Sequence, residues 1–154
     1  MKKKIFVIDD EKDIREILKV NLTSENYDVS TFRSADEALK GLTSEVPELI
    51  ILDIMMDGKD GLQFCRELRS QEKFMNIPVI FLSAKSEEFD KVLGLELGGD
   101  DYMTKPFSIK ELKSRIKAIL RRTGEKPRES GSKILTYKGV ELNTEQYSLK
   151  VDNQ

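Results

Sequence analysis

Short apolar runs in this sequence end on residues that could do chemistry. The run "KIFVI" is followed by Asp9, Asp10 and Glu11, and the run "ELIILD" ends on Asp53. Clustered carboxylates repel one another and burial raises their pKa values, so such a group is costly unless a cation lies among them. If the runs are neighbouring strands, two further side chains would join this group. They are Ser83, which ends "PVIFLS", and Lys105, which follows "DYMT".

The carboxylates predict a magnesium site. Mg²⁺ takes oxygen ligands, keeps several waters and is usually bound by one or two carboxylates with a phosphate group, which suits Asp9 or Asp10 together with Asp53. One carboxylate would remain as a nucleophile, and carboxylates accept phosphoryl groups as acyl phosphates. Phosphoryl transfer needs mainly positioning and charge neutralisation, which a metal ion, a lysine and a hydroxyl group supply. The chain contains no histidine, so an imidazole of its own cannot act as base or phosphate carrier.

A sheet of parallel strands would bring these residues together. Runs rich in Val, Ile, Leu and Phe alternate with helical patterns, which predicts an α/β fold: a doubly wound, five-stranded parallel sheet with right-handed crossovers and helices on both faces. In such sheets functional residues collect at the carboxyl ends of the strands, where the strand order reverses. The expected strands are residues 4–8, 28–32, 48–53, 78–83 and 101–104.

Helices are expected between the strands because apolar residues recur there with helical spacing. The stripes are Ile14, Ile17, Leu18 and Leu22; Leu62, Cys65 and Leu68; Phe89, Val92 and Leu93; and Ile109, Leu112, Ile116 and Ile119. The expected N-caps are Ser34 and Ser108, each with a glutamate three residues later, and Asp60 and Ser86.

Composition bounds the class of protein. The 154 residues, 38% apolar and 35% charged, are typical of a soluble protein with one main core. The formal charge of -2 gives no basic surface over the whole molecule for nucleic acid. No run is long enough to span a membrane and the first residues are not a signal peptide, so we expect a cytoplasmic protein with no membrane partner. The single cysteine, Cys65, excludes an internal disulfide and a cysteine-rich metal site, and its place on an apolar stripe indicates core packing.

The last part of the chain changes character. Residues 123–133, "TGEKPRESGSK", contain Gly, Pro and Ser but no large apolar residue, which predicts a linker. Residues 134–154 show strand-like alternation with turn signals. Two or three short strands do not make a stable domain alone, so we interpret them as the start of an incomplete second domain.

Taken together, the motifs resemble those of the receiver domains of two-component response regulators. The resemblance covers residues 1–122 and rests on "IDDE", "LDIMMDGKDG", "FLSAK", "GLELGGDDYMTKPF" and "IKELKSRIKAILRR". It implies a flavodoxin-like (βα)5 fold and a phosphoacceptor switch rather than an enzyme, with at most self-catalysed phosphorylation and dephosphorylation. The implied phosphoryl donor is a partner sensor histidine kinase.

The resemblance assigns a role to each residue of the predicted site. The roles are phosphoacceptor for Asp53; Mg²⁺ ligands for Asp9, Asp10, Asp53 and the backbone carbonyl of Met55; phosphoryl contacts for Ser83 and Lys105; and conformational switch for Ser83 and Tyr102. The family also has a cis bond at the position of Lys105 and Pro106, which the sequence alone would not indicate.

Residues beside the phosphoacceptor include one departure from the family. Asp57 stands where proline is usual. The extra carboxylate could join the metal shell through water or simply loosen a loop that proline would stiffen, and we favour the second interpretation. Met55 and Lys85 occupy the two positions that flank the phosphoryl group in the family, so we expect the lifetime of the phosphorylated state to depend on them.

The charges near the end of the domain resemble those of the OmpR/PhoB-type subfamily, whose active members dimerise. The tail resembles the sheet that opens the winged-helix DNA-binding domain of that subfamily, but the chain as given stops before a recognition helix. DNA binding and transcription control are therefore expected only through the missing part, and the alternative is a stand-alone receiver that acts through protein contacts. The dimer pairs implied by the resemblance are Lys91 with Glu111, Asp101 with Arg115, and Glu96 with Lys117.

Other classes fit the residues less well. A phosphohydrolase with an aspartyl nucleophile usually has a second acid two residues later, where this chain has Met55. A flavodoxin-like electron carrier needs a phosphate-binding loop rich in Ser, Thr or Gly after its first strand, and "DDEKD" would repel a flavin phosphate. A receiver-shaped binding module without phosphorylation is disfavoured because no position of the site is missing.

Overall fold

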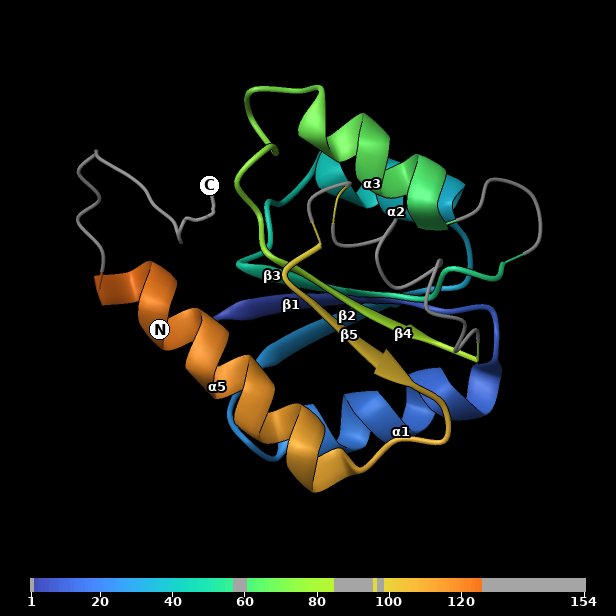
Figure 1. The fold of residues 1–154 in the computed structure, drawn as a ribbon, viewed down its shortest axis with the longest axis vertical. Coiled ribbons are helices and arrows are strands. Elements are labelled where there is room, and N and C mark those ends of the chain that lie inside the picture. Colours follow the sequence, from blue (N-terminus) through green and yellow to red (C-terminus); the bar gives the residue numbers. More distant parts are fainter. Residues whose placement is uncertain (1, 57–60, 85–95, 97–98, 126–154) are drawn as a thin grey trace. The chain divides into compact units, whose positions relative to one another are not determined.

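The sheet has the predicted architecture. The structure is a computed structural model that describes residues 2–56, 61–84, 96 and 99–125. Its strands are β1 (Lys4–Ile8), β2 (Asp28–Phe32), β3 (Leu49–Leu52), β4 (Val79–Ser83) and β5 (Asp101–Thr104). They pair in parallel in the order β2-β1-β3-β4-β5 (Figure 1). The five-stranded parallel sheet expected from the apolar runs is thus confirmed.

Helices cover both faces of the sheet. They are α1 (Lys12–Thr23), α2 (Ala35–Leu42), α3 (Gly61–Arg69) and α5 (Ile109–Glu125). The chain divides into two units, residues 1–116 and 117–154, so α5 crosses the boundary between them. Within the first unit, α2 and α3 lie on one face, and α1 and the beginning of α5 lie on the other (Figure 1). Helix α5 continues to Glu125, three residues into the segment expected to be a linker.

Burial on both faces explains why the strand sequences are continuously apolar. Alternate residues of a strand point to opposite faces. In β1, Phe6 and Ile8 join the core under α2 and α3, whereas Ile5 and Val7 point to the opposite face, and all four are fully buried. A strand with no solvated face has no place for the polar residues of an alternating pattern.

The first helix is less buried than its apolar stripe suggested. Leu18 and Leu22 are buried, but the side chain of Ile17 is 44% exposed, so the prediction for Ile17 is wrong. The reason is that α1 packs on β2 and β1 at the edge of the sheet, where a narrow stripe of one helix is enough to cover the strands. The stripe at residues 89–93 and the N-caps Asp60 and Ser86 lie outside the described residues.

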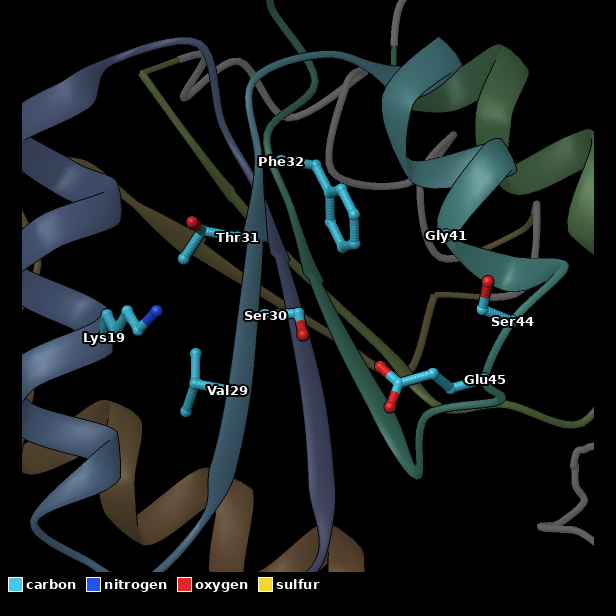
Figure 2. Close-up of a pocket in the computed structure, with 8 residues that line it drawn as sticks. All are labelled: Lys19, Val29, Ser30, Thr31, Phe32, Gly41, Ser44 and Glu45. Atoms are coloured by element: carbon cyan, nitrogen blue, oxygen red, sulfur yellow. The ribbon is translucent and has the colours of Figure 1, made fainter.

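Side-chain caps and one close contact fix the helix ends and the position of α2. The Ser34 hydroxyl accepts the Glu37 N–H at 3.2 Å, and the Ser108 hydroxyl accepts the Glu111 N–H at 3.1 Å, as the cap spacing predicted. Gly41 lies where the Phe32 ring meets α2, at a pocket along the open edge of β2 (Figure 2). A Cβ atom at this glycine would lie 2.7 Å from the ring, so a larger residue would force the Phe32 ring to move.

A charged network closes the amino ends of the strands, away from the predicted site. The Lys4 ammonium lies 2.9 Å from Glu45, 3.2 Å from Asp28 and 2.9 Å from the Ser30 hydroxyl. Burial opposes the charge of Lys4, but the hydrogen bonds to its carboxylate neighbours outweigh burial and raise its pKa. The network ties β1, β2 and the segment before β3 together.

No helix in the described part of the chain has the length and apolarity needed to cross a membrane. The predicted second domain, residues 134–154, lies outside that part, as does most of the predicted linker.

Candidate functional site

The acidic residues meet where the direction of winding reverses. The chain leaves β1 toward β2 and later passes to β3 on the other side of β1, so β1 and β3 are neighbours whose connections diverge. A crevice forms at such a point at the carboxyl ends of the strands. Asp9 directly follows β1, Asp53 directly follows β3, and the Asp53 N–H donates to the Ile8 carbonyl at 2.9 Å.

Three carboxylates converge in this crevice. Oxygen atoms of Asp9, Asp10 and Asp53 all lie within 4.8 Å of one another. Asp9 and Asp53 are only 2% and 3% exposed, whereas Asp10 is exposed. Two buried acids side by side are unfavourable without a cation, and the oxygen-only donor set with one solvent-facing ligand suits a hard divalent ion that keeps some waters.

Lys105 reaches the acids from the end of β5. Its ammonium lies 2.9 Å from Asp9, 3.5 Å from Asp53 and 3.7 Å from Glu11, and its side chain is 11% exposed. The Lys105–Pro106 peptide bond is cis, as the family resemblance implied. The lysine expected at the site is therefore in contact with both buried acids.

Ser83 and Tyr102 complete the predicted set. Ser83 is fully buried at the end of β4, and its carbonyl accepts the Lys105 N–H at 2.8 Å. Tyr102 is 9% exposed, and its ring centroid lies 6.1 Å from that of Phe81. Tyr102, for which the resemblance implied a switch role, is therefore buried in this structure. A pocket of about 410 Å³ opens beside it, between β5 and the start of α5.

The surroundings of Asp53 disfavour its charge. Burial and the negative charge of Asp9 raise the pKa of Asp53 from 3.8 to about 6, although Lys105 and the Met55 N–H oppose the rise. Burial also raises the pKa of Asp9, against the opposing effect of the Glu11 N–H and of Lys105. Burial lowers the pKa of Lys105, but its carboxylate partners outweigh burial and the net pKa is raised. The site is thus an acid pair that shares one ammonium.

Backbone contacts hold the two buried acids in place. The Glu11 N–H donates to Asp9 Oδ1 at 2.9 Å, and the Met55 N–H donates to Asp53 Oδ1 at 3.1 Å. The Arg15 guanidinium donates to the Asp9 carbonyl at 2.9 Å. These bonds fix one oxygen of each carboxylate and leave the other for Lys105.

Sequence reasoning missed Arg15 and Gly61. Arg15 lies one helical turn after Glu11, and this spacing allows but does not indicate a return to the strand end. Gly61 begins α3, and a Cβ atom there would lie 2.3 Å from the Asp53 carbonyl oxygen and 2.8 Å from the Ile54 Cα. The helix can approach the Asp53 backbone this closely only because the residue is glycine.

Three of the charged residues expected to pair between two chains contact one another within one chain. The Arg115 guanidinium lies 2.6 Å from Asp101 and 2.7 Å from Glu111. Glu96 and Lys117 are exposed. The remaining residues named from the sequence, Asp57, Lys85 and Lys91, lie outside the described residues.

Comparison with known proteins agrees with this geometry. Residues 5–117 match the family described as the response regulator receiver domain. The alkaline phosphatase synthesis transcriptional regulatory protein PhoP of Bacillus subtilis (strain 168) is 55% identical over 123 residues, which are 80% of this chain and 50% of that protein. The chain therefore spans about half the length of this curated relative.

Solved structures show the same fold. A two-component response regulator from Clostridium difficile is 30% identical with a TM-score of 0.76, over 80% of this chain and 100% of its own. The BeF3-activated N-terminal receiver domain of Klebsiella pneumoniae RstA is 31% identical with a TM-score of 0.72, over 77% of this chain and 99% of its own. With this sheet order, this acid cluster and a family match over most of its length, the chain belongs to the response regulator receiver domain family.

Proposed function

We propose that Asp53 accepts a phosphoryl group from a histidine of a separate sensor kinase and that the domain acts as a switch. The observation that carries this proposal is the environment of Asp53: a carboxylate 3% exposed, next to a second buried acid and 3.5 Å from an ammonium. The 154 residues contain no histidine, so none of them can be the donor. The reaction moves the phosphoryl group from the donor nitrogen to a carboxylate oxygen of Asp53, and a new P–O bond replaces the P–N bond.

The residues around Asp53 fit Mg²⁺. Asp9, Asp10, Asp53 and the Met55 carbonyl would hold the ion, which when bound neutralises negative charge on the phosphoryl oxygens. Lys105 supplies a second positive charge from the end of β5, and Ser83 supplies a hydroxyl donor from the end of β4. Positioning and charge neutralisation are what phosphoryl transfer requires of a protein, so no further base is needed.

Phosphorylation of Asp53 would add negative charge at the carboxyl ends of the strands, where Ser83 and Lys105 can respond to it. A phosphoryl group on Asp53 would attract the Ser83 hydroxyl and Lys105, which would draw the hydrogen-bonded ends of β4 and β5 toward Asp53 together. Tyr102 lies on β5 two residues before Thr104, which is in register with Ser83, so the Tyr102 ring and the pocket beside it would respond to that movement. In this way phosphorylation of Asp53 would change the conformation of the surface formed by β5 and the start of α5.

The output proposed for this face is a symmetric dimer. Because Arg115 already binds Asp101 and Glu111 within one chain, the pairs expected across a two-fold axis would form by exchange of these contacts. The pairs remain Lys91 with Glu111, Asp101 with Arg115 and Glu96 with Lys117. The relative PhoP is named a transcriptional regulatory protein, so transcription control is proposed for a full-length protein that contains a DNA-binding part.

The phosphorylation proposal is tested by intact mass spectrometry. The wild type, Asp53→Asn and Asp13→Asn are incubated with acetyl phosphate and Mg²⁺, and Asp13 serves as a control because it is an exposed acid in the first turn of α1. The wild type and Asp13→Asn should gain one phosphoryl group, and Asp53→Asn none. Equal labelling of all three proteins would overturn the assignment of Asp53.

The dimer proposal is tested by sedimentation with beryllofluoride and Mg²⁺. The wild type should dimerise, and Asp101→Ala combined with Arg115→Ala should remain monomeric. A wild type that stays monomeric at high concentration, or a double variant that dimerises as well as the wild type, would contradict it.

A further inference from the structure

Lys105 is held from two sides in this structure. On the inner side lie the buried carboxylates of Asp9 and Asp53, at 2.9 and 3.5 Å from its ammonium. On the outer side lies the carboxylate of Glu11, at 3.7 Å, whose side chain is 60% exposed. Glu11 is thus the solvent-side partner of a lysine that is otherwise enclosed.

The side chain of Glu11 does not cap its own helix. Glu11 is the N-cap residue of α1, yet it forms no side-chain cap hydrogen bond. Its N–H instead donates to Asp9 Oδ1, while Lys105 binds Asp9 Oδ2. The backbone of Glu11 therefore fixes the inner partner of the lysine, and its carboxylate provides the outer one.

We propose that Glu11 is a positioning residue that holds Lys105 in the resting site and so limits how readily this lysine turns to a phosphoryl group on Asp53. The inference rests on the proposed phosphorylation of Asp53. An ammonium with partners on both sides must break the outer contact before it can move fully to the inner side. Loss of that contact should therefore speed phosphorylation, although the ion pair is exposed and the gain is limited to about two- to five-fold.

Two substitutions separate contact from charge. Glu11→Gln removes the charge. Glu11→Asp keeps the charge but is one methylene shorter, and aspartate at an N-cap accepts a hydrogen bond from the first turn of its own helix, which draws it away from Lys105. A contact effect predicts that both variants accelerate, whereas a purely electrostatic effect predicts that only Glu11→Gln does.

The control is Asp13→Asn, which removes a charge from the first turn of the same helix without touching Lys105. The measurement is the initial rate of labelling by acetyl phosphate with Mg²⁺, followed by intact mass. Each substitution at Glu11 is also made with Lys105→Met, because a positioning role must vanish when the positioned residue is absent.

The expected result is that Glu11→Gln and Glu11→Asp label about two- to five-fold faster than the wild type, that Asp13→Asn does not, and that neither Glu11 variant has an effect in Lys105→Met. Unchanged or slower rates in Glu11→Asp, or an acceleration that persists in Lys105→Met, would overturn the inference. A wild type and Asp53→Asn that label equally would instead overturn the proposed function itself, so the two failures are distinguishable.

Discussion

Replacement of Asp53 by asparagine should stabilise the domain. In the folded protein the pKa of Asp53 is raised from 3.8 to about 6 by burial and by Asp9. A shift of about two pKa units corresponds to ~3 kcal/mol, because one unit is about 1.4 kcal/mol. The uncharged amide avoids this cost and can still accept the Met55 N–H. We therefore expect Asp53→Asn to raise the free energy of unfolding by up to ~3 kcal/mol at pH 7.

The sign of the pH dependence follows from the direction of the shift. Between pH 3.8 and 6 the folded protein binds more protons at Asp53 than the unfolded chain does, so the stability of the wild type falls as the pH rises through this range. The variant lacks this group. The difference between the two proteins should be small near pH 4, grow up to about pH 6 and then stay constant.

Urea unfolding in EDTA at several pH values measures this difference. Mg²⁺ should reduce it, because an ion that binds the folded wild type stabilises that protein and the variant has lost one ligand. Asp13→Asn, which removes an exposed carboxylate in the first turn of α1, serves as the control. A stability gain that is independent of pH, or a wild type as stable as Asp53→Asn at pH 7 in EDTA, would refute the reasoning.

Further substitutions test other parts of the structure. Lys105→Met should lower the free energy of unfolding by about 3 kcal/mol at pH 7, and by less at pH 5, where Asp53 can protonate; equal losses in urea at both pH values would contradict this. Gly61→Ala should slow labelling by acetyl phosphate about 10- to 100-fold because its Cβ would displace the backbone of Asp53, the proposed phosphoacceptor. Gly41→Ala should instead lower the free energy of unfolding by about 1–3 kcal/mol, because its Cβ crowds the Phe32 ring, and should be labelled at the wild-type rate. Equal labelling rates of the two glycine variants would count against the role of Gly61. Lys4→Met should cost about 1 kcal/mol at pH 7. Because the pKa of Lys4 is raised in the folded protein, this loss of stability should disappear above pH 10.5 as the wild-type lysine deprotonates. Thermal unfolding at several pH values measures it, and a stability difference between wild type and Lys4→Met that does not change with pH would contradict this explanation.

The sheet and the rim of the site were predictable because both follow from local sequence. Strands buried on both faces are continuous apolar runs, and parallel strands place their carboxyl ends at one edge. The positions of Asp9, Asp53 and Lys105 could therefore be read before the structure was known. The periodicity of α1 was less informative, since it does not show how much of a stripe the sheet covers, and Ile17 remains exposed.

Contacts between elements could not be predicted in the same way. The spacing of Glu111 and Arg115 allows an ion pair on one helix, but the bond from Arg115 to Asp101 depends on how α5 lies beside β5. The contact of Glu11 with Lys105 joins the two ends of the domain sequence. The need for glycine at Gly61 depends on how closely the start of α3 lies against the Asp53 backbone, which no sequence pattern encodes.

The bond between the Lys105 N–H and the Ser83 carbonyl has a mechanical consequence. Thr104 is in register with Ser83, so the ladder between β4 and β5 continues one step beyond the strands and joins the backbones that carry the ammonium and the hydroxyl. Two hydrogen-bonded strands move more easily together than past each other, because sliding would break the hydrogen bonds between them. A force on the side chain of Ser83 or of Lys105 therefore acts on both backbones. The carboxyl ends of β4 and β5 should then move together, which favours an all-or-none movement over a graded one.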